Sequence, residues 1–180
     1  MPSYVALLRA VNVGGRNRVA MAQLRATLEA LGHEDVSTYV QSGNVVFRSP
    51  SRSVSSVRSG LERAIQDDFG LDVVVIVRTR AELAGVVERN PFRISRATEP
   101  QLHVAFLADR PTRPSVARLD PERSPPDEFA VVDRQVYLRC PNGMGRTKLT
   151  NDYLERQLGT SATVRNWRTV NELRRLVESR

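Results

Sequence analysis

The residues with the greatest chemical potential lie in four polar segments, which are rich in glycine, asparagine and basic side chains. Glycines let backbone N–H groups approach a ligand, and a loop that leads into a helix places such groups at a helix N-terminus, where anions bind. Residues 12–18 form such a segment before a predicted helix, and residues 143–151 join a predicted strand to another helix. The pattern indicates a site for a phosphate-bearing ligand.

The one lysine of the chain, Lys148, stands among 27 basic residues, of which the other 26 are arginines. An ammonium group is a compact point charge and guanidinium a planar fork, so this lysine marks a position where arginine does not serve. Its segment fails both the P-loop spacing G-x-x-x-x-G-K-[ST] and the fingerprint G-x-G-x-x-G, which excludes a P-loop NTPase. The alternative is a solvated loop in which Thr150 or Asn151 caps the next helix.

Side chains with ordinary catalytic chemistry are few. His33 follows a predicted helix end, and His103 alternates with apolar residues in a predicted strand, where a structural role is expected. Cys140 has no histidine near it in sequence, although a spatial pair with His103 stays open. One cysteine and two histidines exclude a Cys/His zinc site, and we expect no metal and no cofactor.

The net charge of +7 and the pI of about 10.6 suit a polyanionic partner such as nucleic acid. Arginines scattered along the chain are equally typical of a solvated surface. The longest aliphatic run, residues 73–77, is too short to span a membrane, and no signal peptide is visible. These features exclude a membrane protein and a disulfide scaffold, and we expect a cytoplasmic protein of undetermined oligomeric state.

Hydrophobic periodicity predicts a regular order of elements in the first half of the chain. The predicted strands are residues 4–8, 36–41, 45–48 and 72–78. The predicted helices are residues 20–31 and a helix that Ser53 caps and that runs to about residue 69. The order βαββαβ is that of ferredoxin-like domains. A capping box at residues 79–82 opens a further helix, which Asn90-Pro91 ends at the predicted domain boundary.

The second half follows a similar pattern. Its predicted strands are residues 102–107, 129–132 and 135–139, and its predicted helices are residues 114–119, about 150–158, and one from about 166. The sequence therefore predicts an α+β fold with two ferredoxin-like, βαββαβ-type subdomains, residues 1–90 and 91–180. The second is expected to be incomplete, with an extra C-terminal helix.

Strands 4–8, 45–48 and 72–78 carry apolar side chains on both faces. Such strands are buried on both faces, so the C-terminal half or another subunit is expected to cover the face that the helices leave open. This counts against an RNA-recognition motif, which needs an open sheet with exposed aromatic residues. The aromatic signature of that module is also missing from residues 42–47.

The predicted topology brings two of the polar segments together. The loop after the first strand and the hairpin between the second and third strands lie at one edge of the sheet. Two groups should therefore be neighbours: Asn12, Gly14, Gly15 and Arg16, and Gln41, Ser42, Gly43 and Asn44. The alternative is that these residues only form turns, with the asparagines bonded to their own backbone.

The segments YVALLRAVNVGG, YVQSGNVVF, NGMGRTKLTN and ATVRNWRTV resemble, in order and spacing, small bacterial proteins grouped as a domain of unknown function, number 1697. The resemblance runs from about residue 3 to 177 and implies two ferredoxin-like subdomains, but no reaction. This chain has Ala10-Val11 where the family often has glycine, and Arg16 where lysine is frequent. The positions that match the family, Leu149 aside, together with Arg16, are taken as candidate ligand-binding residues: Asn12, Gly14, Gly15, Arg16, Gln41, Ser42, Gly43, Asn44, Gly145, Arg146, Lys148, Thr150, Arg165, Asn166 and Trp167.

Three functions remain open from the sequence. The first is a binding protein for a phosphate-bearing ligand, a nucleotide or a nucleic acid, with Arg16, Arg146 and Lys148 on phosphate and Gln41 and Asn44 reading a base or sugar. The second is an enzyme for a small phosphorylated or nucleotide substrate, in which Lys148 stabilises charge. The third is a structural or interaction module whose motifs only fix turns. Trp167, on the apolar stripe of its helix, is expected in the core.

Overall fold

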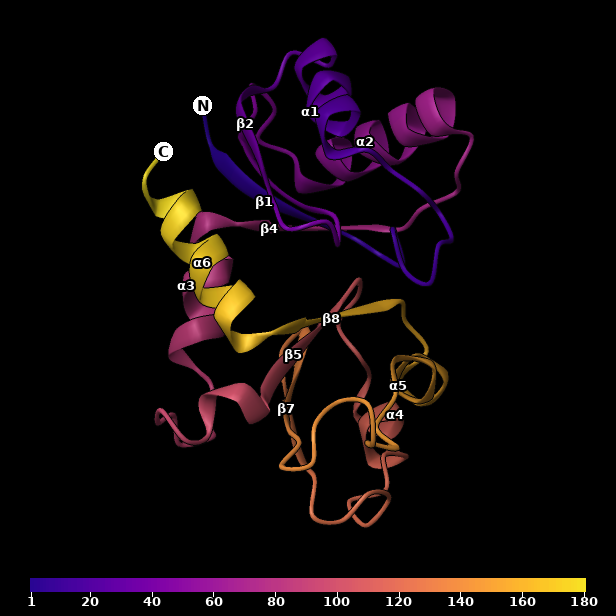
Figure 1. Ribbon diagram of the computed structural model, residues 1–180, viewed down its shortest axis with the longest axis vertical. Helices are drawn as coiled ribbons and strands as arrows, with labels where there is room; N and C mark the ends of the chain where they lie inside the picture. The colour runs from indigo at the N-terminus through magenta and orange to yellow at the C-terminus, as the bar shows by residue number, and fades with distance from the viewer. The chain divides into compact units, whose positions relative to one another are not determined.

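The computed structural model describes residues 1–180, and its chain divides into two compact units. The first unit is Met1–Gly85 together with Glu172–Arg180, and the second is Val86–Asn171. Each contains one four-stranded sheet with helices packed on it (Figure 1). No helix combines the length and the apolar character that crossing a bilayer requires.

The first unit holds an antiparallel sheet of strand order β2-β3-β1-β4. Its strands are β1 (Ser3–Leu8), β2 (Glu34–Tyr39), β3 (Asn44–Arg48) and β4 (Val75–Thr79). Its helices are α1 (Met21–Ala30) and α2 (Val54–Phe69), and α3 (Arg80–Glu88) continues from it into the second unit. The βαββαβ order predicted for the first half is confirmed.

Local signals in the sequence set the ends of two of these helices. The Ser53 hydroxyl accepts the Ser56 N–H at 3.2 Å and caps α2, and Gly70 ends it with a left-handed φ of 65°. At α3 the predicted capping box is present. The Thr79 hydroxyl accepts the Glu82 N–H, and the Glu82 carboxylate accepts the Thr79 N–H.

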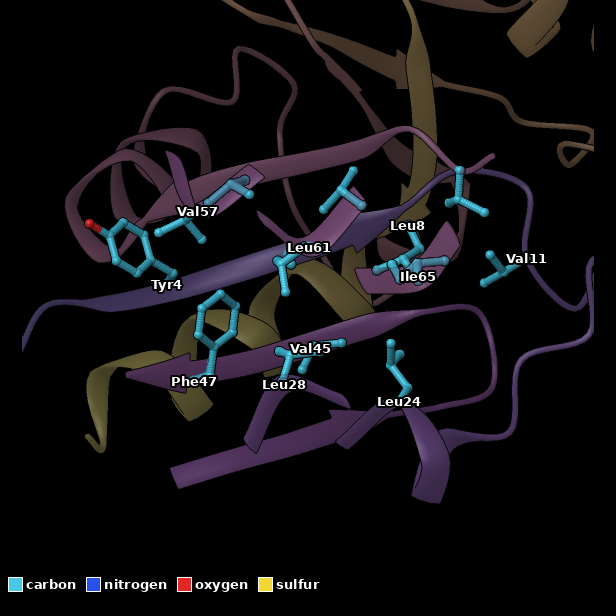
Figure 2. Close-up of a cluster of buried hydrophobic side chains, with 14 of the residues drawn as sticks. Tyr4, Leu8, Val11, Leu24, Leu28, Val45, Phe47, Val57, Leu61 and Ile65 are labelled. Carbon is cyan, nitrogen blue, oxygen red and sulfur yellow. The ribbon is translucent and has the colours of Figure 1, made fainter. Parts of the chain in front are cut away.

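The core of the first unit lies between α1, α2 and one face of the sheet (Figure 2). Alternate strand residues point into it, and the helices contribute one apolar stripe each. Its labelled members include Tyr4, Leu8, Val45 and Phe47 of the strands and Leu24, Leu28, Val57, Leu61 and Ile65 of the helices. Residues of the opposite face, such as Val5, Val46 and Ile76, are buried too, so the prediction of two buried faces is confirmed.

The second unit contains an antiparallel sheet of order β6-β7-β5-β8. Its strands are β5 (Leu102–Leu107), β6 (Glu128–Val132), β7 (Gln135–Arg139) and β8 (Ala162–Asn166). A 3-10 turn, η1 (Glu99–Gln101), precedes β5, and the helices are α4 (Arg113–Ala117) and α5 (Asn151–Leu158). Helix α6 (Trp167–Glu178) begins here and ends in the first unit.

The second βαββαβ copy is complete, which corrects the expectation that it lacks a strand. The missing strand is β8, which pairs antiparallel with β5 and leads directly into α6. Only Ala162 and Val164 of its five residues are apolar, and they pack on the core of this unit, whereas the polar residues Thr163 and Arg165 are buried on the other face of the strand. Apolar periodicity alone therefore misses it.

The register makes the two copies equivalent residue by residue. Val5 pairs with Arg78 in the first sheet, and Val104 pairs with Arg165 in the second. Both arginines are buried, in the last strand before a capped helix. The architectural repeat expected from the sequence is therefore also a repeat of individual positions.

A matching carboxylate ties a helix to the start of the last strand in each unit. Glu62 of α2 accepts the Val75 N–H at 3.0 Å. Glu155 of α5 accepts the Ala162 N–H at 2.8 Å. Each bond satisfies a strand N–H that has no partner in the ladder at that position, so both units use the same device.

Candidate functional site

Two of the polar segments, residues 12–18 and residues 41–44, meet at one end of the first sheet, as predicted. The Leu8 N–H donates to the Gly43 carbonyl at 2.8 Å, which joins the end of β1 to the β2–β3 hairpin. The Asn12 amide donates to the Gln41 carbonyl at 2.7 Å. The loop after β1 and this hairpin therefore form one structural group.

Asn12 uses its side chain to hold the loop together. Its amide donates to the Val19 carbonyl at 2.9 Å as well as to Gln41, and its oxygen accepts the Val19 N–H at 2.8 Å. Its φ of 54° is left-handed, a conformation that asparagine tolerates better than most residues. The amide is engaged within the protein, as the turn-forming alternative expects.

Asn44 is fully buried, in contrast to a side chain that reads a base or sugar. Its amide donates to the Tyr39 carbonyl at 3.0 Å and to the Ser42 hydroxyl at 2.9 Å, which closes the β2–β3 hairpin. Gly43 has a φ of 82° and no room for a side chain. These contacts assign Asn44, Ser42 and Gly43 a part in shaping the hairpin.

Residues 12–18 form a small β-hairpin, which we call the finger. Val13 and Arg16 pair as an antiparallel bridge around Gly14 and Gly15, whose φ angles of 57° and 72° are left-handed. The Arg16 N–H donates to the Val13 carbonyl at 3.0 Å. Residues 13–18 are exposed, so the Arg16 guanidinium is presented to solvent.

The backbone of the polar segment at residues 143–151 packs against residues 120–127 of the same unit. The Lys148 N–H donates to the Ser124 hydroxyl at 2.9 Å, and its carbonyl accepts the Arg123 side chain at 3.0 Å. The side chains of Lys148 and Arg146 are exposed, and so is Gly145. Thr150 caps α5 by accepting the Tyr153 N–H at 3.2 Å, as the alternative reading of this segment expects.

The last of the four polar segments, ATVRNWRTV, comprises β8 and the start of α6. Arg165 is buried and donates to the Thr163 hydroxyl at 2.7 Å and to the Val164 carbonyl at 3.0 Å. Burial lowers the pKa of the Arg165 guanidinium to about 10. Asn166 is exposed and caps α6 by accepting the Thr169 N–H at 2.8 Å. Trp167 is buried, as expected for a core residue.

A cavity of about 430 Å³ opens at the N-terminus of α6 in the second unit. Asn166 and Trp167 line it, and they are the only two of the candidate residues that do. The other lining residues are Glu99, Pro100, His103 and Arg168. The cavity therefore joins a helix N-terminus, a cation, a carboxylate and an imidazole in one concave surface.

His103 contributes an imidazole to this cavity. Burial lowers the pKa of its imidazole, an effect that its contact with the Gln101 carbonyl partly opposes. The imidazole is therefore neutral at pH 7. His103 pairs with Asn166 across β5 and β8, which places both at the same end of the sheet.

Nothing in the sequence singles out Glu99, Pro100 and Arg168 as site residues, and His103 is expected there only as a structural residue or a partner of Cys140. The signal that could have found them is β8 itself, because recognising this strand aligns Asn166 with His103. Arg16, Gln41 and their neighbours belong to the first unit, whereas Asn166 and Trp167 belong to the second. A single patch made of all four segments stays a prediction.

Cys140 does not have the properties of a catalytic nucleophile. It is fully buried, and its thiol contacts the Met144 sulfur at 3.7 Å. Burial, together with the charge of Asp127, raises the pKa of the Cys140 thiol to about 11, so the thiolate is scarce at neutral pH. No group of three or more His, Cys, Asp and Glu side chains is placed to hold a metal ion.

Comparison with known proteins bears on the fold and the family. The chain is similar to the conserved bacterial protein SP0830 from Streptococcus pneumoniae, with 21% sequence identity, a TM-score of 0.73 and 98% of each chain covered. That likeness shows a shared fold. No curated protein matches the sequence.

A family model described as a protein of unknown function, DUF1697, matches residues 1–137. The match includes the finger and the β2–β3 hairpin. The segments around Lys148 and Asn166 lie beyond the matched residues. Since the model covers well over half of the sequence, the chain belongs to the DUF1697 family.

Proposed function

We propose that this protein binds a small phosphate-bearing ligand in the cavity at the N-terminus of α6. The observation that carries the proposal is the composition of the cavity wall. Asn166, Trp167 and Arg168 form the start of a twelve-residue helix there. The first N–H groups of a helix have no partner within the helix, and its dipole favours negative charge.

The helix start offers donors that a phosphate can use. Asn166 occupies the Thr169 N–H, which leaves the earlier N–H groups of Trp167 and Arg168 without a partner inside the helix. The Arg168 side chain is exposed and adds a full positive charge on the same wall. Such a combination of backbone donors and a guanidinium binds phosphate oxygens.

Glu99 narrows the class of ligand. Its carboxylate lines the same cavity and repels a bare anion, whereas it accepts hydrogen bonds from hydroxyl or amino groups. A sugar phosphate or a nucleotide carries both a phosphate and such donors. The cavity therefore suits these ligands better than inorganic phosphate.

A thermal-shift assay tests the proposal with nucleotides, sugar phosphates and inorganic phosphate. A ligand at 100 times its Kd stabilises the folded state by about 2.7 kcal/mol, which raises the melting temperature by several degrees. Arg168→Ala should abolish that rise, and Arg156→Ala should keep it, because Arg156 is exposed on α5 away from the cavity lining. No rise with any of these compounds contradicts the proposal.

A variant of Lys148 tests the location of the site in the same thermal-shift assay. Lys148 does not line the cavity, so Lys148→Arg should bind the ligand like the wild type. Loss of the thermal rise in this variant would favour a site at residues 143–148 instead.

An enzyme acting on the same class of ligand is a second candidate, which His103 specifically favours. A neutral imidazole in a concave site can accept a proton from a bound substrate. His103→Gln should then keep the ligand-induced thermal rise and abolish turnover of the ligand that the assay identifies. Full turnover in this variant would exclude His103 as the base.

A further inference from the structure

Several residues in the finger and just before it have a left-handed backbone conformation, which costs free energy. Ala10, Asn12 and Asn17 all have left-handed φ angles, of 56°, 54° and 49°. A single residue in this conformation costs about 1–2 kcal/mol, least for asparagine. Asn17 donates from its amide to the Ala10 carbonyl at 3.0 Å, and the Asn12 N–H donates to the Asn17 carbonyl at 3.0 Å. These bonds stabilise this conformation of residues 10–17.

The finger presents two cations that no carboxylate neutralises. Arg16 and Arg18 are exposed, and neither forms an ion pair within the protein. The first acidic residue of the sequence is Glu29, and residues 36–61, which include the neighbouring hairpin, contain none. The positive charge of the finger therefore faces no carboxylate in its own loop or in the hairpin to which it is bonded.

The tip of the finger leaves its backbone open. No atom outside the local chain lies within 4 Å of the position that a Cβ on Gly14 would take, and only the Arg18 side chain approaches Gly15. The N–H groups of both glycines have no partner in the protein. Two guanidinium groups and two backbone donors are thus available to one partner.

The composition of the finger favours a nucleic acid over an acidic protein. A specific protein interface usually buries about 800 Å² on each side around an apolar centre. The finger has one large apolar side chain, Val13, and the adjacent hairpin has one exposed, Val40. Phosphate contacts need only cations and N–H donors, which the finger provides.

We propose that the finger binds the sugar-phosphate backbone of a nucleic acid, with Arg16, Arg18 and the Gly14–Gly15 backbone on phosphate oxygens. The contact carries no base specificity, because nothing in the finger is shaped to read base edges. It does not depend on the cavity of the second unit. Since both faces of the first sheet are buried, the contact is made by a loop and not by the open sheet of an RNA-recognition motif.

Salt-dependent binding of a fluorescent 20-nucleotide uridine RNA tests this proposal. Each phosphate contact on a single strand contributes about 0.7 to the slope of log K against log salt, so the double variant Arg16→Ala/Arg18→Ala should lower the slope by about 1.4. The matched control is Arg52→Ala/Arg63→Ala, which removes the same charge from exposed positions of the first unit. That control should keep the slope within about 0.3 of the wild type.

Three results would overturn the proposal. They are no RNA binding by the wild type at 50 mM salt, an equal loss of slope in both double variants, and equally tight binding of a polyglutamate peptide. The cavity variant Arg168→Ala should bind the RNA like the wild type, so failure of the small-ligand proposal leaves this test unaffected. Circular dichroism confirms that each variant is folded.

Discussion

Gly43 lies where the β2–β3 hairpin touches the end of β1, with a left-handed φ of 82°. A Cβ at this position would stand 2.6 Å from the Val11 side chain and 2.8 Å from the Cβ of Leu8. Neither neighbour can move freely, because both are buried. The position therefore requires glycine for its space as well as for its backbone angle.

We expect Gly43→Ala to destabilise the protein by about 2–4 kcal/mol, since overpacking adds to left-handed strain. Gly70→Ala is the matched control, because Gly70 has a similar φ of 65° but open space around it. It should cost about 1 kcal/mol. Urea denaturation measures the free energy of unfolding of both variants. Equal losses would show that left-handed strain, without overpacking, accounts for the cost at Gly43.

Cys140 gives a prediction about pH. Its folded-state pKa of about 11 exceeds the ordinary value of 9.0, so between these values the folded state keeps a proton that the unfolded state has lost. The contribution of Cys140 to the free energy of unfolding is therefore fully present below pH 9, and it is lost as the pH rises towards 11. Cys140→Ser should show a shallower decline of unfolding free energy over that range than the wild type.

The same burial predicts slow chemistry at Cys140. At pH 8 iodoacetamide should modify the native protein much more slowly than the urea-unfolded protein, because the thiol is both inaccessible and protonated. Mass spectrometry follows the reaction. Rapid labelling of the native protein would contradict the burial.

Residue types alone could suggest candidates at this scale but not their roles. Asn12 and Asn44 were predicted at one edge of the sheet, and they are there, yet their amides serve the backbone. Whether an asparagine faces a ligand or a carbonyl depends on the turn in which it stands. The three-dimensional path of residues 39–44 supplies that information.

Elements are repeated between the units together with the contacts that fix them. Glu62 and Glu155 hold the first N–H of β4 and β8 from equivalent helices. We expect Glu62→Ala and Glu155→Ala each to cost about 1–3 kcal/mol, because each leaves a strand N–H without its partner. Gln at either position keeps an acceptor and should cost less. Thermal or urea unfolding compares the four variants, and a loss at only one position would argue against equivalence.

Most elements could be predicted from the sequence because their apolar side chains follow a helix or strand period. The strand at residues 102–107 is predicted to the residue, and α2 begins directly after Ser53, its predicted cap. Strand β8 could not be found in this way, since it has only two apolar residues, Ala162 and Val164, and its other face buries the polar side chains of Thr163 and Arg165. The cavity depends on that strand, and so its members His103 and Arg168 were not recognised.

On the scale of the whole molecule, the chain returns to its first unit at the end. Residues 172–180 belong to that unit, and they include the buried side chains Leu173 and Val177. Arg180 donates to the Asp35 carbonyl and to the Ser37 hydroxyl at β2. The C-terminal segment is therefore part of the structure of the first unit.

Removal of residues 172–180 should cost more than about 4 kcal/mol, because a large buried aliphatic side chain contributes about 2–5 kcal/mol. Removal of Ser179 and Arg180 alone, which are not part of the core, should cost less than about 2 kcal/mol. Circular dichroism during heating measures both deletions. Similar melting temperatures for the two would show that Leu173 and Val177 contribute little.

The return of the chain also bears on synthesis at the ribosome, where domains generally fold from the N-terminus onward. The first 85 residues emerge early, but the segment that completes their unit is translated after the whole of the second. Nascent chains of this protein should thus gain full protease resistance in their N-terminal half only once residues 172–180 have emerged from the ribosome.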